Sequence, residues 1–447
     1  MSVDTGEQIP SKKWYRKFRY WFALSLLLIV GTAFVMWYTS ARNVQNQLAK
    51  IREAGLPTSA DEVNDFYVVP SDEIDSTEAW IEAMDAVMLA SESTPGLKLP
   101  FVGEASTKIP TPEQDWEQLA ECRSFLEKHE RELRLIREAA NMKGAVRFPA
   151  DFSFGLSTVL TYTQQARQVA RILALDAHVS AHDGNFSQAK NDVLHIIALA
   201  DALRYEPTLI SQLVQMAIRS IAYEVLKELT WHCDWNADDI AELQTAVAGL
   251  DIRLAMLTAL QGERGVYVSA LEQTTIGPFR QSNVREGLRF FDAMISGVES
   301  SWPMALEQSQ RLSTELNAMS NSGIKKLTIM GVLLLMPSME HAISAGARAV
   351  AKQRATYLLL AARIHQLRAD SIPDNLQALA GDSVSAEMFQ EMSRDPFNGQ
   401  PLRYANSSST LSIYSIAENG IDDGGFCDYD EEKGPPKDAG ITVSLPD

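Results

Sequence analysis

The sequence predicts a mainly α-helical protein with a transmembrane helix near its N-terminus, and three observations support this fold class. An uncharged apolar run occupies residues 20–41. Through much of the following chain, apolar residues recur at the three-to-four-residue spacing of amphipathic helices. Near the C-terminus, apolar and polar residues alternate over a few positions, which is typical of a β-hairpin. We therefore expect a cytoplasmic N-terminus (1–19), a transmembrane helix (20–41), a juxtamembrane helix and linker (42–110), a helical-hairpin domain (111–345), and a small α+β module with a short antiparallel sheet and an acidic tail (346–447).

The apolar run at residues 20–41 is long enough to cross a bilayer, because about twenty apolar residues span the hydrocarbon core. Five Lys or Arg residues precede it within residues 12–19, whereas the ten residues after it contain only Arg42 and Lys50. This asymmetry predicts a single-pass protein of the cytoplasmic (inner) membrane, with its N-terminus inside and the bulk of the chain periplasmic or otherwise extracytoplasmic. A cleaved signal peptide is an alternative, although its apolar region is usually shorter. A buried globular helix is disfavoured by the flanking cations.

Composition narrows the range of functions. A net charge of −18 disfavours nucleic acids and anionic lipid surfaces as partners, because both would repel the chain. The three cysteines, Cys122, Cys233 and Cys427, are far apart and form no C-x-x-C motif, which excludes zinc-ribbon and thioredoxin-type motifs. We expect three isolated thiols. One bridged pair is the alternative in an oxidising compartment.

Helical patterns continue beyond the apolar run. We expect the membrane helix to extend to Glu53 and to end near Gly55, since glycine is favoured just after a helix. A linker follows, with a short helix after Ser59. Residues 76–91 are amphipathic. A long helix is expected over residues 111–142, because a proline and a glutamine in its first turn fit the N1 position and a capping box.

The clearest helical signal lies in residues 156–231, where three apolar stripes follow one another. The dipeptide Gly184–Asn185 predicts a turn between the first two helices, and Pro207 is expected to open the third. This antiparallel pairing is similar to a tetratricopeptide-type helical hairpin. Since no 34-residue recurrence is present, we expect an α-hairpin array and not a counted repeat.

The rest of the helical region is less regular. We expect one helix over residues 236–260, short helices and turns over 262–303, a helix over 305–319, and another over 346–368. Between the last two lies a second apolar run, residues 327–339, which is too short to cross a bilayer. It predicts a buried or interfacial helix, with a re-entrant or membrane-surface segment as the alternative.

A distinct pattern lies in the C-terminal module, where residues 411–414 read as a strand and 402–404 as its hairpin partner. The residues that carry the pattern are Asp395, Pro396, Phe397, Gly399, Pro401, Tyr404, Tyr414, Ser415, Asn419, Gly420, Asp422, Asp423 and Gly424. This order resembles the globular part of the major pseudopilin of type II secretion systems. In that family a long helix leads to a D-P-[WF]-x-G-x-P-x-x-Y hairpin, a Y-S-[LIV]-x-x-[ND]-G turn and a run of Gly and Asp.

The resemblance covers about 100 of the 447 residues and has one clear departure. Pseudopilins carry a filament-forming N-terminal helix with a Gly-Phe cleavage site and a Glu a few residues further on. The N-terminal helix of this chain has neither feature, so we do not expect it to polymerise as a pilin. The arrangement looks like that of uncharacterised bacterial single-pass membrane proteins that end in this segment.

The resemblance also implies a calcium site, because pseudopilins hold a calcium ion in the acidic loop after the hairpin. The candidate ligands in this chain are Asp422, Asp423, Asp428, Asp430 and Asp438. Calcium takes six to eight oxygen ligands, which a loop rich in Gly and Asp can supply. No EF-hand spacing is present, and a solvated acidic tail is the alternative interpretation.

The sequence contains no strong catalytic motif: G-x-S-x-G, G-x-x-x-x-G-K-[ST] and G-x-G-x-x-G are all absent. His178 and His182 share a helix face and could bind zinc, with His195 further along the chain. A metalloprotease would need Glu directly after the first histidine, where this chain has Val179. We therefore favour structural roles for these histidines.

Together these observations predict a non-enzymatic, membrane-anchored protein of the cell envelope that binds other envelope proteins on its helical body. The C-terminal resemblance adds an accessory role in a secretion or pilus-like system. The alternative is a metal-dependent envelope hydrolase that uses the face carrying His178 and His182.

Overall fold

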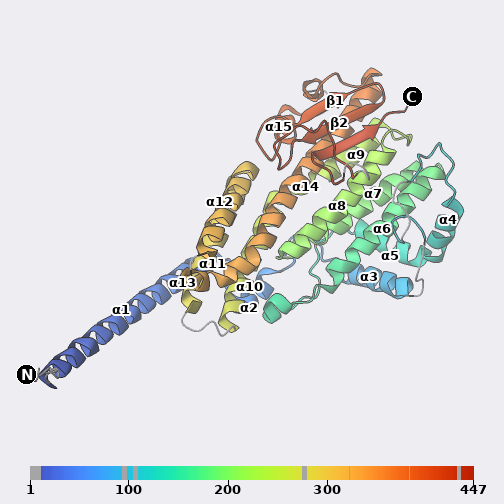
Figure 1. Ribbon diagram of the computed structural model, residues 1–447. Coiled ribbons are helices and arrows are strands. Elements are labelled where there is room, and N and C mark those ends of the chain that lie inside the picture. The colour runs from blue at the N-terminus through green and yellow to red at the C-terminus, as the bar shows by residue number, and fades with distance from the viewer. Residues whose placement is uncertain are drawn as a thin grey trace, which may run out of the picture.

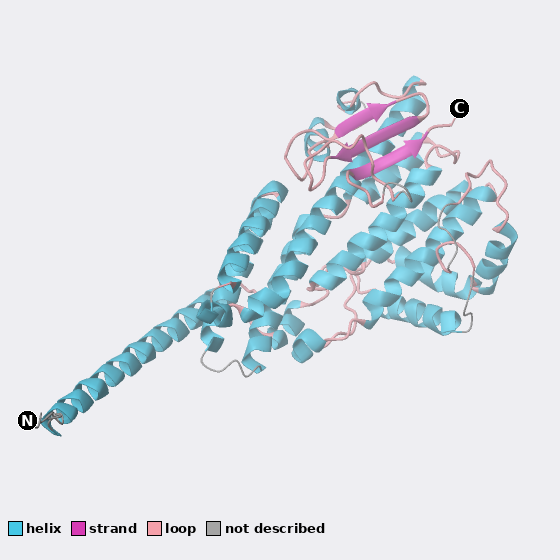
Figure 2. Ribbon diagram, viewed as in Figure 1, coloured by secondary structure: helices cyan, strands magenta, loops and turns pink. Residues whose placement is uncertain are grey.

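The computed structural model describes residues 12–92, 98–103, 109–273, 279–321, 323–381, 383–429 and 434–446. It confirms the mainly helical fold class with a small antiparallel sheet (Figures 1 and 2). A long N-terminal helix projects from a body of packed helices, and the sheet lies at the end of the body opposite to that helix (Figure 1).

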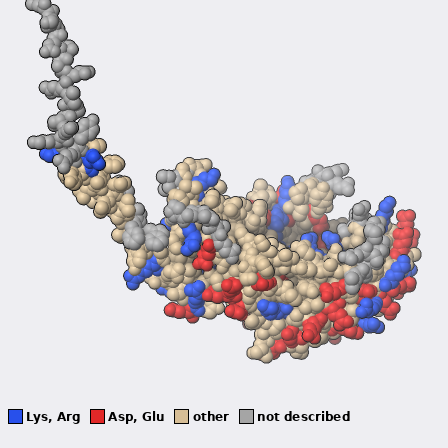
Figure 3. All heavy atoms as spheres, turned by 90° about the horizontal axis from the view of Figure 1, so that it is seen from below, with Lys and Arg blue, Asp and Glu red and all other residues tan. Residues whose placement is uncertain are grey.

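The projecting helix, α1 (Lys12–Glu53), is continuous but lies in two environments. In its first part large apolar side chains are exposed, and Tyr20 and Leu27 are 75% and 72% exposed. In its second part Leu48 and Ile51 are buried in the core of the body. Figure 3 shows the described surface of the projecting part as largely uncharged. Several side chains within residues 20–41 lie outside the described part, and the transmembrane assignment stays a prediction.

The segments after α1 follow the sequence predictions closely. Gly55 adopts a φ of +73°, as expected for a residue that follows a helix C-terminus. The short helix after Ser59 is α2 (Ala60–Phe66), and the Ser59 hydroxyl accepts a hydrogen bond from the backbone N–H of its first turn. The amphipathic segment forms α3 (Thr77–Glu92), whose apolar face is buried.

The single helix expected over residues 111–142 is wrong in two respects. Its first residues form turns, and the helix begins only at α4 (Leu119–Lys128). It then breaks at His129 and resumes as α5 (Glu130–Asn141). The Nδ1 atom of His129 lies 2.7 Å from the carbonyl oxygen of Phe125, the acceptor that an unbroken helix would offer to the backbone N–H of His129.

The predicted hairpin region is confirmed as three antiparallel helices. Gly184, with a φ of +74°, makes the first turn, and the side chain of Asn185 caps the second helix. Thr208, the residue after the predicted Pro207, caps the third. The elements of this region are η1 (Phe152–Ser157), α6 (Thr161–His182), α7 (Phe186–Asp201) and α8 (Leu209–Leu229).

The next region departs from the prediction. Asn236 forms a capping box at the start of the expected helix, but this helix, α9 (Ala237–Ala248), ends early, and α10 (Ile252–Gln273) follows. Instead of short helices and turns, most of the described residues in 262–303 belong to α10 and α11 (Arg280–Ser300).

Two glycines of this region, Gly262 and Gly287, are close-packing positions inside helices. A Cβ atom on Gly262 would lie 2.0 Å from the carbonyl oxygen of Pro207. A Cβ atom on Gly287 would lie 2.0 Å from the ring of Tyr267. Each glycine therefore allows a neighbouring segment to approach its helix more closely than any other residue would.

One stretch of the described chain, Ala237–Glu272, is long and apolar enough to cross a membrane by length and composition. It comprises α9 and most of α10, which are separate helices divided at residues 249–251. Half of its most apolar window is buried, and both helices pack against α14 within the body. The core helices of globular proteins have the same composition.

The second apolar run joins a longer helix. After α12 (Trp302–Ser320) and α13 (Gly323–Thr328), a single helix, α14 (Met330–Ala369), includes both the residues 330–339 and the separately predicted helix over 346–368. Pro337 lies within it and is exposed. Water can therefore satisfy the carbonyl group that the proline leaves without a helical partner.

The C-terminal module packs a sheet against α14 (Figure 2). The expected hairpin is confirmed, with Tyr404 paired to Ile413, and a third strand pairs with the other edge of the hairpin. That strand lies in the segment predicted as an acidic tail. The elements are η3 (Leu376–Leu379), α15 (Ala386–Met392), β1 (Arg403–Asn406), β2 (Thr410–Ser415) and β3 (Ala439–Ser444).

The helix α14 connects two apolar cores. Its first half packs with α10–α12 and the second part of α1. Its second half packs with α6–α9 and the sheet. The domain boundary predicted between residues 345 and 346 falls within this helix.

Candidate functional site

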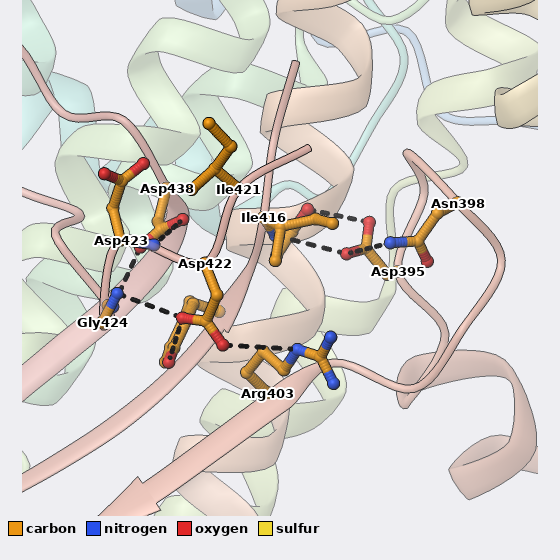
Figure 4. Close-up of polar contacts among 12 residues, drawn as sticks. Asp395, Asn398, Arg403, Ile416, Ile421, Asp422, Asp423, Gly424 and Asp438 are labelled. Carbon is orange, nitrogen blue, oxygen red and sulfur yellow. Dashed lines mark hydrogen bonds and ion pairs between the residues drawn. The ribbon is translucent and has the colours of Figure 1, made fainter. Parts of the chain in front are cut away.

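The predicted calcium ligands are brought together only in part. Asp438 is fully buried, and its carboxylate accepts backbone N–H groups of Gly425 at 2.9 Å and Phe426 at 3.1 Å. The N–H of Asp423 lies 3.5 Å from its other oxygen (Figure 4). Burial raises the pKa of Asp438, and these three N–H groups oppose that effect. This carboxylate therefore orders the loop around residues 423–426.

Asp422 and Asp423 lie beside it but point to different partners. Asp422 accepts the hydroxyl of Tyr414 at 2.9 Å and the N–H of Gly424 at 3.0 Å, and it lies 3.6 Å from the guanidinium of Arg403 (Figure 4). Asp423 accepts the amide of Asn419 at 2.7 Å. A calcium ion at this loop would compete with these donors for the same oxygens.

The other two predicted ligands are not part of this cluster. Asp428 pairs with Lys227 on α8 at 3.1 Å, and Asp430 lies outside the described residues. Among the residues that the structure describes, no group of three or more His, Cys, Asp or Glu side chains is placed to hold a metal ion. The calcium site stays a prediction.

Asp395, the first residue of the pseudopilin-like pattern, connects the hairpin to its surroundings. Its buried carboxylate accepts the N–H of Phe397 and the hydroxyl of Ser415, both at 2.7 Å. The N–H of Ile416 and the amide of Asn398 lie 3.4 Å away (Figure 4). The observed role of this aspartate is to fix the loop before β1 to the end of β2.

The two histidines of the alternative metal site have separate protein partners. His178 is buried, stacks on the ring of Phe101, and has its Nε2 atom 3.2 Å from the carboxylate of Glu228. The Nε2 atom of His182 lies 3.1 Å from the carbonyl oxygen of Pro110. Burial lowers the pKa of His182.

The three cysteines are separate and none forms a disulfide. Burial raises the pKa of Cys122 to about 11, and the pKa values of Cys233 and Cys427 to about 12. At neutral pH all three are therefore thiols and not thiolates, which are the nucleophilic form.

A feature that the sequence did not reveal is a groove of about 580 Å³ between α5, α7 and α9. Its apolar lining includes Trp80, Ile197 and Ala198, and its polar lining includes Asn141 and Asn191. Within the described part, neither asparagine amide has a hydrogen-bond partner. No periodic pattern distinguishes these residues, because three helices that are distant in sequence contribute them.

A cluster of buried charges lies beneath α7, the central helix of the groove. Arg137 on α5 pairs with Asp176 on α6 and lies 3.4 Å from Asp192 on α7. Burial, together with the neighbouring carboxylate of Asp192, raises the pKa of Asp176 to about 7, and Arg137 opposes this shift. His195, which lines the groove, has its Nδ1 atom 3.6 Å from Asp192. The cluster ties α5 and α7, two of the helices that line the groove, to α6.

A smaller apolar cavity of about 290 Å³ lies between α8 and α14. Ala217 and Ala349 face it from the two helices, and the ion pair between Lys352 and Glu224 lies at its side. Lys352, together with Lys227, lowers the pKa of Glu224 to about 2 despite its burial. The ion pair therefore remains charged at neutral pH.

The chain matches no protein-family model, no curated protein and no solved structure in the comparisons. Its function is therefore argued from the geometry described above.

Proposed function

We propose that this protein is a membrane-anchored scaffold of the cell envelope that holds a segment of a partner protein in the groove between α5, α7 and α9. The observation that carries the proposal is the groove itself. Its lining is partly apolar, and it also carries the side-chain amides of Asn141 and Asn191, which have no hydrogen-bond partner within the described residues. A surface that binds a polypeptide needs both features, because it contacts the peptide backbone as well as apolar side chains.

The support for the proposed anchoring is the exposed apolar surface of α1. Residues such as Trp21, Leu27 and Val35 expose most of their apolar surface, and exposing such surface to water is unfavourable by about 25 cal/mol per Å². A bilayer removes this penalty, and the run within residues 20–41 has the required length. The buried residues Leu48 and Ile51 make the same helix part of the body, so the groove is held at a fixed position relative to the anchor.

The groove fits an extended or helical segment. Asn141 at the end of α5 and Asn191 on α7 can each donate to and accept from a peptide backbone. Leu194 and Ala198, one turn apart on α7, offer apolar contacts between them. The partner segment would therefore carry at least one apolar side chain.

An accessory role in a secretion or pilus-like system is a narrower proposal that rests on the pseudopilin-like pattern alone. Its support is the hairpin that Asp395 connects to the preceding loop, in a sheet that packs against α14. No observed geometry favours the metal-dependent hydrolase: within the described residues no group of three or more His, Cys, Asp or Glu side chains is placed to hold a metal ion, and the Nε2 atoms of His178 and His182 lie beside different protein groups.

The proposal is tested by site-specific photo-crosslinking of the full-length protein in its membrane. A benzophenone amino acid at Asn191 places the crosslinker in the groove, and the same residue at Arg311, an exposed position on α12, is the matched control. We expect an adduct with an envelope protein from the groove position only. Its loss in the Ala198→Trp background would show that the groove is required.

Equal adducts from both positions, or none from the groove, would overturn the proposed function. The identity of the adduct decides the narrower proposal. Secretion or pilus-type components would support the accessory role, and other envelope proteins would support the scaffold without it.

A further inference from the structure

Three large apolar side chains are exposed where α13 leads into α14. Leu327, Met330 and Leu334 are 41%, 40% and 78% exposed, and they follow one another at intervals of three and four residues. Met330 and Leu334 lie one turn apart on the same face of α14, and Leu327 lies at the end of α13, before the break at Ile329. We refer to Leu327, Met330 and Leu334 as the apolar shoulder.

The opposite face of this segment is firmly held. Ile329 and Val332 are buried in the core with α10 and α11. The side chain of Asn283 on α11 donates to the carbonyl of Leu327 at 2.8 Å and accepts from the N–H of Gly331 at 3.0 Å. The shoulder is therefore a fixed feature of the surface, since its backbone is bonded on the inner side.

The shoulder lies at the end of the body from which α1 emerges. α11 contacts both α1 and α13, and Gln47 on α1 donates to Asp292 on α11 at 2.8 Å. The exposed Lys326 precedes the shoulder. Apolar side chains beside a cation, next to a membrane helix, are characteristic of segments that lie in the bilayer interface.

We propose that the apolar shoulder inserts into the outer surface of the same bilayer that anchors α1. This inference rests on the proposed anchoring. The lipid surface is favoured over a second copy of the chain because α1 keeps the shoulder close to the bilayer within one molecule, at high effective concentration. With two contact points, the body would be held against the membrane in one orientation.

The test uses the full-length protein in lipid nanodiscs, with Cys427→Ser as background because the other two cysteines are buried. An environment-sensitive fluorophore is attached at Leu334→Cys, at Leu27→Cys on α1, or at Arg311→Cys on α12. Spin-labelled lipids then quench the probes that contact lipid. We expect the probe at residue 334 to lose about half of its fluorescence with headgroup-labelled lipid, because it would lie at the level of the interface.

Quenching at residues 27 and 334 but not at 311 supports the inference. Quenching at residue 27 alone overturns it and leaves the proposed anchoring intact. Absence of quenching at both positions overturns both. A third outcome is a probe at residue 334 that is shielded from water but not quenched by lipid, in nanodiscs that hold two protein copies. In that case a second copy covers the apolar shoulder, and the proposed lipid contact is wrong.

Discussion

The helical body and the C-terminal module are held together in different ways. In the body, α6, α7 and α8 bury aliphatic side chains such as Leu173 and Ile196 completely, and the contact between these helices is mainly apolar. In the module, Asp395 and Asp438 each accept several hydrogen bonds from the loops around the sheet. Apolar burial depends on area and shape, whereas a carboxylate stabilises only the donors that point at it.

The difference explains how the two regions appear in the sequence. Apolar burial repeats along each helix and is visible as a periodic pattern. Each carboxylate of the module accepts hydrogen bonds from the loops around it. In the sequence it therefore appears only as an isolated aspartate within a Gly- and Pro-rich segment. It also predicts that a buried carboxyl group of the body without a cationic partner among the described residues, such as that of Glu206, is costly when ionised.

The largest expected effect is in the apolar body. Replacing the fully buried Leu173 by alanine should lower the free energy of unfolding by about 2–5 kcal/mol, because it removes apolar contacts and leaves a cavity. Chemical denaturation of the detergent-solubilised full-length protein measures this change. Leu254→Ala, at a position that is 60% exposed, is the control and should change the value by less than about 0.5 kcal/mol. A similar effect at both positions would contradict the comparison.

The second effect is the pH dependence of the body. Glu206 is buried, its carboxylate accepts the hydroxyl of Thr163 at 3.1 Å, and burial raises its pKa from 4.5 to about 7. The folded state therefore binds a proton that the unfolded state has released. Its contribution to stability is fully present below pH 4.5 and is lost as the pH rises through 7.

Glu206→Gln removes this titration while keeping the shape of the side chain. Between pH 5 and pH 8 the wild type should lose on the order of 2–3 kcal/mol of unfolding free energy relative to the variant. Denaturation curves across this range measure the difference. Parallel pH profiles for the two proteins would show that the carboxyl group is not protonated in the folded state.

A smaller and more local effect is expected in the module. Asp438→Asn should cost about 1–3 kcal/mol, because the amide cannot accept all the N–H groups that the carboxylate accepts. Faster hydrogen exchange at Gly425 and Phe426 would report the loosened loop. The control is Asp428→Asn, since Asp428 is exposed and its ion pair with Lys227 should be worth less than about 1 kcal/mol. If both variants exchange alike, the buried carboxylate is not what orders the loop.

The smallest expected effect concerns calcium. If the predicted site forms, calcium at ten times its dissociation constant should stabilise the protein by about 1.4 kcal/mol, and Asp422→Ala with Asp423→Ala should abolish this gain. Thermal unfolding with calcium, with magnesium, and with chelator measures it. Glu307→Ala, an exposed position on α12, is the matched control. No calcium-dependent rise in the wild type would exclude the site.

Where local pattern decides the structure, the sequence was sufficient. The turn at Gly184, a helix starting at Asn236 and the hairpin between residues 402–404 and 411–414 were all predicted correctly, because each depends on residues that are close in sequence. The candidate ligands Asp422, Asp423 and Asp438 were also placed near one another, but the donors that occupy them come from the fold and could not be inferred.

The groove could not be predicted at all. Asn141, Asn191 and Ala198 belong to patterns that are ordinary for helix surfaces, and they form one site only because α5 and α7 pack side by side. Similarly, the strand β3 lies in a segment that reads as an acidic tail. Its pairing with β2 satisfies backbone groups that would otherwise bind water.

The sequence by itself determined the helical class, the uncharged run at residues 20–41 and the chain reversal at Gly184, because helix period, apolar length and turn residues are local properties. Only the tertiary structure decided that Gly262 and Gly287 lie inside helices, and that α14 continues through Pro337. Glycine permits both a turn and close packing, and an exposed proline costs a helix less than a buried one. Which outcome occurs depends on the segments packed against each residue.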